Sequence, residues 1–176
     1  MTTTRRLKTL RPAKDFEMDL LVEQDSENYS AVARFDGTMG TEPFFVPPHW
    51  HKHHDEYITV LEGRMTVTLD GRETVLTPEA GSIFIPRRTV HSFRGFHGEK
   101  TVFEERNQPA GIYKALFFND VFQMGKSPNF WLAVRSAIDG DLYAHLPLGS
   151  KLLDELFIIV FGTVARLFAP AKPKAL

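Results

Sequence analysis

The chain has 176 residues, 43% hydrophobic and 24% charged, which matches one ordinary globular domain. Its formal net charge of −1 gives no electrostatic reason to expect a nucleic-acid partner. The absence of cysteine excludes disulfides, thiolate metal sites and cysteine nucleophiles, and it favours the reducing cytoplasm. No apolar run follows the basic residues near the N-terminus, so no secretory signal is expected.

Short apolar segments separated by turn residues predict β-strands through the first part of the chain. They are expected at 17–22, 30–35, 43–46, 56–61, 64–69, 72–76, 82–86, 89–94 and 100–106. Residues 64–69 alternate polar and apolar side chains and end at Asp70-Gly71, a pair that favours a tight hairpin turn. Short strands at this spacing predict an antiparallel β-sandwich or barrel.

After residue 110 the apolar residues recur at helical spacing. Helices are predicted over 111–122, 129–138 and about 150–168. We therefore expect a single-domain, all-β fold with a helical tail: an antiparallel barrel over 15–108, then a helical extension over 109–170.

The last predicted helix has a wide apolar stripe, with its charged residues expected mainly on the opposite face. The stripe comprises Leu152, Leu153, Leu156, Phe157, Ile159, Val160, Val164, Leu167 and Phe168; the charged set is Lys151, Asp154, Glu155 and Arg166. The uncharged run 156–165 is about half of the ~20 residues that a membrane span needs, so no transmembrane span is expected. Apolar residues beyond one face predict burial on two sides, as a lid or in a homodimer. Attachment to a membrane surface is the alternative.

Residues 47–57, PPHWHKHHDEY, hold four of the seven histidines. Alternate residues of a strand share a face, so His49 and His51 are expected to point the same way. Glu56 shares its strand face with apolar residues, and His91 lies within a neighbouring predicted strand. Three neutral imidazoles and one carboxylate would suit a divalent transition metal: Fe, Mn, Ni, Cu or Zn.

Two segments resemble the signatures of the cupin superfamily. His49-Trp-His51, followed by Glu56 and Gly63 at family spacing, resembles the first signature; residues 81–91, GSIFIPRRTVH, resemble the second. This resemblance implies an RmlC-like jelly-roll barrel. It also implies a metal site whose ligands are His49, His51, Glu56 and His91.

Parts of the chain depart from that pattern or extend it. Arg88 stands where the family usually has glycine, and Ser82 replaces a common aspartate. The tail segments 139–149 and 153–168 resemble those of small fungal cupins encoded among natural-product genes. That resemblance implies a role in secondary metabolism.

An apolar lumen is predicted from strand parity. The inward set is Ile58, Val60, Met65, Val67, Leu69 and Phe93, with Phe44 or Phe45 and one face of residues 83–85. The chain has 15 phenylalanines. An aromatic-lined barrel would suit a hydrophobic, cyclic or aromatic small molecule, although most of these residues are also what a barrel core needs.

Three further side chains are candidates for catalysis. His53 could replace a ligand or act as a base, although His53 and His54 are otherwise expected to be solvated loop residues. Glu104 lies beside Glu105 on a late strand, where one of them could face the lumen as an acid or base. Arg88 at the barrel mouth could bind a carboxylate or enolate. For each, a solvated surface role is the alternative.

These observations leave several functions open. The first is a metal-dependent enzyme that oxygenates or oxidatively cleaves a hydrophobic small molecule. The second is a redox-neutral isomerase, cyclase or dehydratase in which the metal acts as a Lewis acid. The third is a non-enzymatic small-molecule-binding protein, and a storage role is the fourth. The sequence contains no phosphate-binding loop or dinucleotide fingerprint, so no cofactor beyond a metal is expected.

Overall fold

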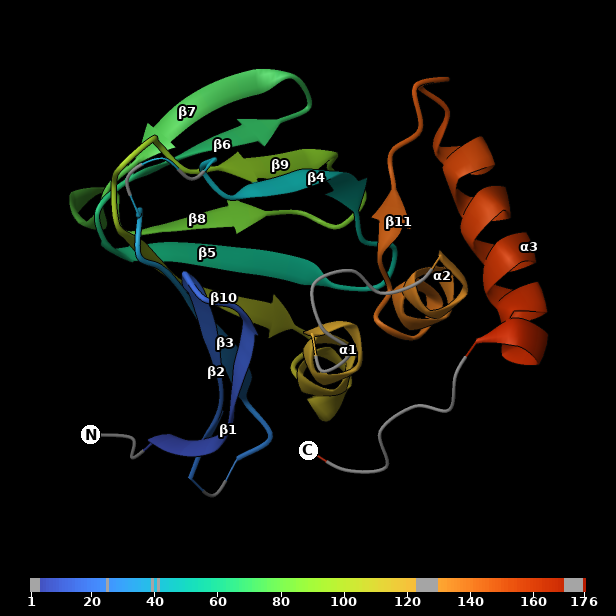
Figure 1. Ribbon diagram of the computed structural model, residues 1–176. Coiled ribbons are helices and arrows are strands. Elements are labelled where there is room, and N and C mark those ends of the chain that lie inside the picture. Colours follow the sequence, from blue (N-terminus) through green and yellow to red (C-terminus); the bar gives the residue numbers. More distant parts are fainter. Residues whose placement is uncertain (1–3, 25, 39, 41, 123–129, 170–175) are drawn as a thin grey trace.

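The computed structural model describes residues 4–24, 26–38, 40, 42–122, 130–169 and 176. Two antiparallel sheets are followed by three helices (Figure 1). The first sheet has the order β1 (Thr4–Ala13), β2 (Phe16–Glu23), β3 (Tyr29–Phe35), β10 (Thr101–Gln108), β5 (Asp55–Glu62), β8 (Ser82–Ile85). The second has the order β11 (Tyr143–Ala144), β4 (Phe45–Trp50), β9 (His91–Arg94), β6 (Met65–Leu69), β7 (Arg72–Leu76). A 3₁₀ turn, Pro78–Ala80, precedes β8.

The expected strands are all present, and side chains of both sheets meet in one core. Buried Leu20 and Ile58 of the first sheet pack in the same cluster as Met65 and Phe93 of the second. The hairpin predicted at Asp70-Gly71 joins β6 to β7, and both residues have positive φ, 43° and 84°. This is the turn geometry that an Asp-Gly pair favours, so the predicted hairpin is confirmed. The two antiparallel sheets and the C-terminal helices confirm the predicted fold class.

Sequence reasoning missed β1, which carries several basic residues. Its partner β2 supplies the counter-charge, because Asp19 accepts a hydrogen bond from Thr9 (2.5 Å) and lies 3.3 Å from the Arg6 guanidinium. Buried Leu10 joins the core. The strand therefore depends on cross-strand pairing that its own sequence does not reveal.

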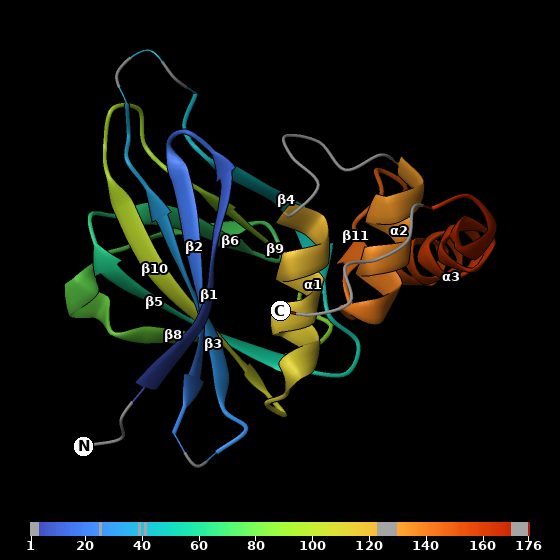
Figure 2. The ribbon, with the colours of Figure 1, turned by 60° about the horizontal axis from the view of Figure 1, so that its bottom comes forward.

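The three helices extend sideways from the sheets. They are α1 (Ile112–Phe122), α2 (Phe130–Asp139) and α3 (Lys151–Phe168), close to the predicted bounds. Figure 2 shows α1 beside the strands, α2 next to it and α3 outermost. Gly162 of α3 lies directly on α2, where an added Cβ would come within 3.0 Å of the Val134 carbonyl oxygen. A larger side chain there would separate the two helices.

Of the two surfaces expected to cover the apolar stripe of α3, the barrel does not do so. The opposite face packs inward, where Asp154 is fully buried and accepts hydrogen bonds from Trp50 Nε1 (3.0 Å), His145 Nδ1 (2.8 Å) and the Leu146 N–H (2.8 Å). The apolar stripe instead faces outward: Leu167 is 80% exposed. The three hydrogen bonds supply the partners that a buried carboxylate needs. Within the described residues, no helix combines the length and apolarity needed to cross a membrane.

Candidate metal centre and adjoining cavity

Four side chains converge inside the barrel from neighbouring strands. His49 lies on β4, His51 directly after it, Glu56 on β5 and His91 on β9. All four are buried, and one nitrogen or oxygen from each lies within 4.8 Å of the others. Antiparallel pairing places His49 opposite His91, with ring centroids 4.2 Å apart.

Each of the three histidine rings is held through its Nδ1. A backbone carbonyl can only accept, so each ring is the Nδ1–H tautomer, and its Nε2 carries the lone pair. The acceptors are Pro47 for His49 (2.8 Å), Asp141 for His51 (2.8 Å) and Thr89 for His91 (3.0 Å). Such outer hydrogen bonds commonly orient metal-binding histidines.

Three of the inward-facing atoms are buried without a well-formed hydrogen bond from the described residues: His51 Nε2, His91 Nε2 and Glu56 Oε2. They face one another instead, with Oε2 3.3 Å from His51 Nε2 and 2.9 Å from His91 Nε2. Buried polar atoms almost always have partners. A cation among these atoms would satisfy all three, and imidazole nitrogens with a carboxylate suit a divalent transition metal. The residues therefore fit a metal.

Electrostatics keeps most of the cluster in its metal-binding form. Burial lowers the pKa of His51 to about 3, with help from the positive charge of Lys114, and burial likewise holds the pKa of His49 well below 6.5. Burial alone would raise the pKa of Glu56, but His91 and His51 offset it and keep that pKa well below its usual range. Burial also opposes charge on His91, although the Glu56 carboxylate raises its pKa. Neutral imidazole and ionised carboxylate are the forms that bind metal.

A residue about ninety positions away holds the histidine loop. Asp141 accepts hydrogen bonds from the backbone N–H of His53 (2.7 Å), from that of Lys52 (3.3 Å) and from His54 Nδ1 (2.8 Å). The His54 ring stacks on His51 with centroids 4.1 Å apart. The expectation that His54 is solvated is therefore wrong: it is only 1% exposed. Asp141 carries no motif, so sequence reasoning could not assign it this role.

The three candidates for catalysis lie outside this cluster. His53 is exposed. Glu104 is half-buried, with its Oε2 3.5 Å from Arg106 Nε. Arg88 is exposed and lies 5.9 Å from the Trp50 ring, and its φ of 68° explains why glycine suits this position. The described residues that line the aromatic cavity beside the cluster do not include His53, Glu104 or Arg88. Their catalytic roles stay predictions.

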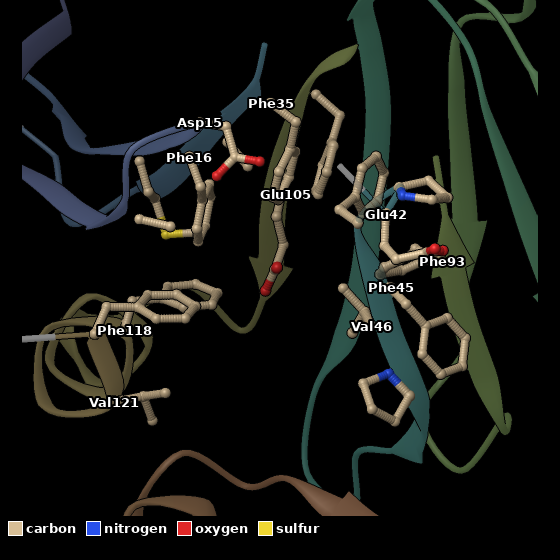
Figure 3. Close-up of a pocket in the computed structure, with 18 of the residues that line it drawn as sticks. Asp15, Phe16, Phe35, Glu42, Phe45, Val46, Phe93, Glu105, Phe118 and Val121 are labelled. Carbon is tan, nitrogen blue, oxygen red and sulfur yellow. The ribbon is translucent and has the colours of Figure 1, made fainter. Parts of the chain in front are cut away.

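A cavity of about 490 Å³ adjoins the cluster, and His49 is part of its wall. Its wall is rich in phenylalanine, including Phe16, Phe35, Phe44, Phe93, Phe103, Phe117, Phe118 and Phe122. Figure 3 shows Glu105 reaching in between the phenylalanines of the strands and Phe118 of α1. The volume and apolar character are those of small-molecule sites.

The predicted inward set divides between core and cavity. Ile58, Val60, Met65 and Val67 are buried and pack the barrel, and Leu69 is partly buried. Phe93 lines the cavity, as does Phe44, whereas Phe45 is 50% exposed at the rim. Of the two adjacent glutamates, Glu105 rather than Glu104 faces inward.

Sequence reasoning did not assign Lys114 to the cavity. It lies on α1, and its Nζ is 3.5 Å from Glu105 Oε1. Burial, then the charge of Glu56, raises the pKa of Glu105 to about 7. One signal could have revealed Lys114: it shares a helix face with Phe117 and Phe118, at the spacing i, i+3 and i+4.

Comparisons with known proteins give matches over the part of the chain that contains the histidine cluster. Residues 39–103 match the family model described as "Cupin domain". The chain is 32% identical to the quercetin 2,3-dioxygenase of Bacillus subtilis over 72 residues, covering 41% of this chain and 20% of that protein. It is 36% identical to oxidoreductase OpS7 of Beauveria bassiana over 47 residues, covering 27% and 15%. The matches thus span a fifth or less of these relatives.

A solved structure similar in fold is an RmlC-like cupin from Shewanella frigidimarina. It is 21% identical, with a TM-score of 0.43, and the match covers 58% of this chain and 84% of that one.

Proposed function

The chain carries a cupin domain of the RmlC-like type, and from this premise we propose that it is a metal-dependent enzyme. Its substrate would be a hydrophobic, cyclic or aromatic small molecule, and its reaction an oxygenation or oxidative cleavage. One observation carries the proposal: His51, His91 and Glu56 direct buried, unsatisfied atoms to one point, and neighbouring His49 borders an aromatic cavity. The names of the similar proteins, a dioxygenase and an oxidoreductase, favour the oxidative reaction.

In this proposal His49, His51, Glu56 and His91 hold the metal. A bound iron, copper, manganese, nickel or zinc ion would supply Lewis acidity and, for the redox-active metals, electron transfer. The protein's own residues would orient the metal ligands and position the substrate. The carbonyls of Pro47, Thr89 and Asp141 hold the rings in place. The phenylalanines exclude water and position an apolar substrate beside His49.

The same residues would serve two alternatives. A redox-neutral isomerase, cyclase or dehydratase could use the metal as a Lewis acid, and a binding protein could hold a metabolite without turnover. A place in secondary metabolism is part of our proposal, in line with the fungal oxidoreductase among the similar proteins.

We also propose a homodimer in which α3 packs on α3 of a second copy. Apolar side chains on this helix are exposed over its whole length: Leu152, Leu153, Leu156, Ile159, Val160, Phe161, Val164, Leu167 and Phe168. Monomeric soluble proteins rarely leave such a patch uncovered. Light scattering on Val160→Lys beside wild type tests this: the wild type should have the dimer mass and the variant the monomer mass.

Elemental analysis of the purified protein tests the metal site. Wild type should contain near-stoichiometric transition metal, and both His49→Ala and Glu56→Ala should contain almost none. His97→Ala is the matched control, because the His97 side chain is 72% exposed and outside the cluster. Wild type that neither contains metal nor takes it up on reconstitution would refute the metal-dependent function.

Oxygen uptake then separates the reaction types. We expect the metal-loaded protein to consume O₂ with quercetin as the probe, and His49→Ala to consume none. Turnover of a substrate that continues without O₂ but stops with a chelator would instead support the Lewis-acid alternative. Binding without any turnover would support the carrier role. His53→Ala, Glu104→Ala and Arg88→Ala in the same assay test the predicted catalytic residues.

A further inference from the structure

A buried charged pair lines the cavity that adjoins the histidine cluster. Lys114 and Glu105 are 5% and 9% exposed, and both line the cavity. The other charged residues that line the cavity are less buried: Asp15 is half-buried, the Glu42 side chain is 93% exposed, and the Glu99 side chain, 37% exposed, pairs with Arg64. Lys114 is therefore the buried cation of the cavity, among the lining residues that the structure describes.

The Lys114 ammonium has donors to spare. An ammonium carries three N–H groups, and among the described residues its ion-pair partner is Glu105, with Oε1 3.5 Å from Nζ. That distance exceeds the ~2.7–2.9 Å of a tight charge-assisted hydrogen bond. Two aromatic rings also lie near it, with Nζ 5.5 Å from the Phe117 centroid and 5.9 Å from that of Phe118. Such contacts stabilise a cation but do not satisfy its N–H groups.

The position of this pair is poorly explained by stability alone. Well-packed apolar residues of similar volume stabilise a core as well as a buried ion pair does, and often better. On α1, Ala115 and Phe118 are apolar and pack into the core, and the other buried polar positions of the helix, Asn119 and Asp120, do not line this cavity. A lysine at this point thus suggests recognition of a ligand.

We propose that Lys114 is a substrate-positioning residue that binds an anionic oxygen on an otherwise apolar molecule. The class of ligand is an aromatic or cyclic compound with one carboxylate, enolate or phenolate group. The phenylalanines contact its apolar body, while Glu105 holds the ammonium in place when the cavity is empty. This inference rests on the proposed function only in that the cavity is the substrate site.

The geometry also gives the ligand an orientation. His49 lines the same cavity as Lys114, and Tyr113, the neighbour of Lys114 on α1, lies 5.6 Å from the His54 ring that stacks on His51. An oxygen bound by Lys114 would thus lie toward the histidine cluster, with the apolar body extending among the phenylalanines. The role that sequence analysis gave to Arg88, binding of an anionic group, passes in this proposal to Lys114.

Calorimetric titration with two matched probes tests the proposal. The probes are 2-naphthoate and 2-naphthamide, which share a ring system and differ in charge. Wild type should bind naphthoate about 10-fold or more tightly than the amide, the range expected for a buried hydrogen bond to a charged group. Lys114→Met should lose this preference while binding the amide within about twofold of wild type. Lys100→Met is the control, since it removes the same charge from an exposed site.

Lys114→Met leaves Glu105 buried without its cation, so this variant could fail to fold. A second comparison avoids the problem: Glu105→Gln against Glu105→Gln/Lys114→Met, which differ only at Lys114 and contain no unpaired carboxylate. The single variant should keep the preference for naphthoate, and the double variant should lose it. A preference that survives in the double variant, or wild type that binds neither probe, would overturn the proposal.

The titrations are made on the protein as purified and again after chelation, because a carboxylate could also bind a metal. A preference that remains after chelation and depends on Lys114 supports the inference even if no metal is ever found. A preference that disappears on chelation assigns the binding to the metal and refutes the role of Lys114, while leaving the metal-dependent function intact.

Discussion

The interior of the barrel has two ends with opposite chemistry. At the histidine end, the buried polar groups are His49, His51, Glu56 and His91. The Nδ1 atom of each histidine is hydrogen-bonded to a backbone carbonyl. At the phenylalanine end the rings stack on one another; Phe35, for example, lies 4.3 Å from Phe16 and 4.2 Å from Phe44, centroid to centroid. Among the described residues, three inner atoms of the first end lack a hydrogen-bond partner, whereas the buried charged groups of the second end are Glu105 and Lys114. Because of this contrast, we propose that the metal ion binds at the histidine end and that the apolar part of the substrate binds at the phenylalanine end.

The largest expected effect on folding comes from the phenylalanine end. Phe103 is buried among Phe35, Phe44 and Phe93, so Phe103→Ala should lower the free energy of unfolding by about 3–5 kcal/mol. Urea denaturation measures the change. Phe84→Ala, at a 47% exposed ring, should have a much smaller effect. If the two ends are independent, both variants should retain the metal content of wild type.

The pH dependence of stability should differ in sign between the ends. His51 has a folded pKa of about 3 against 6.5, so the unfolded chain binds more protons and stability falls as pH decreases from about 6.5 toward 3. Glu105 has a folded pKa of about 7 against 4.5, so its contribution falls as pH increases from about 4.5 to 7. Each effect has a limiting slope of about 1.4 kcal/mol per pH unit.

Urea unfolding of chelated protein between pH 4 and 8 measures both contributions. Relative to wild type, Glu105→Gln should gain stability as pH increases through that window, and His51→Leu should gain as pH decreases below 6.5. Parallel pH profiles for wild type and both variants would show that the two ends do not differ in this way.

A smaller effect should follow from loosening the histidine loop. Asp141→Asn keeps the size of the side chain and tolerates the left-handed backbone, φ 55°, but weakens the bonds to the His53 N–H and His54. Metal affinity should fall about 10-fold, as is typical of residues that hold metal ligands. Competition with a chelating dye gives the affinity. An unchanged value would mean that His51 is positioned without the Asp141 side chain.

The smallest expected effect is at Arg88, which belongs to neither end. Arg88→Gly should relieve the left-handed backbone and change the free energy of unfolding by less than about 1 kcal/mol, in the stabilising direction. Thermal unfolding records this change. A large loss of oxygen uptake in this variant, with stability preserved, would support the predicted catalytic role of Arg88.

Local spacing alone predicted much of this protein. Strand parity placed His49 and His51 together and turned Glu56 inward, and the Asp70-Gly71 pair fixed a hairpin. The bounds of the helices followed from apolar periodicity. These features depend on neighbours within a few residues, so the sequence carries them directly.

Tertiary structure decided the rest. The pairing of Asp141 with the histidine loop, the meeting of Lys114 with Glu105, and the inward turn of Asp154 each join residues that are distant in sequence. The choice of Glu105 over Glu104 as the inward glutamate depended on how β10 pairs with β3 and β5. A sequence shows that a residue is polar, but the partner that makes its burial favourable is known only once distant strands and helices have packed.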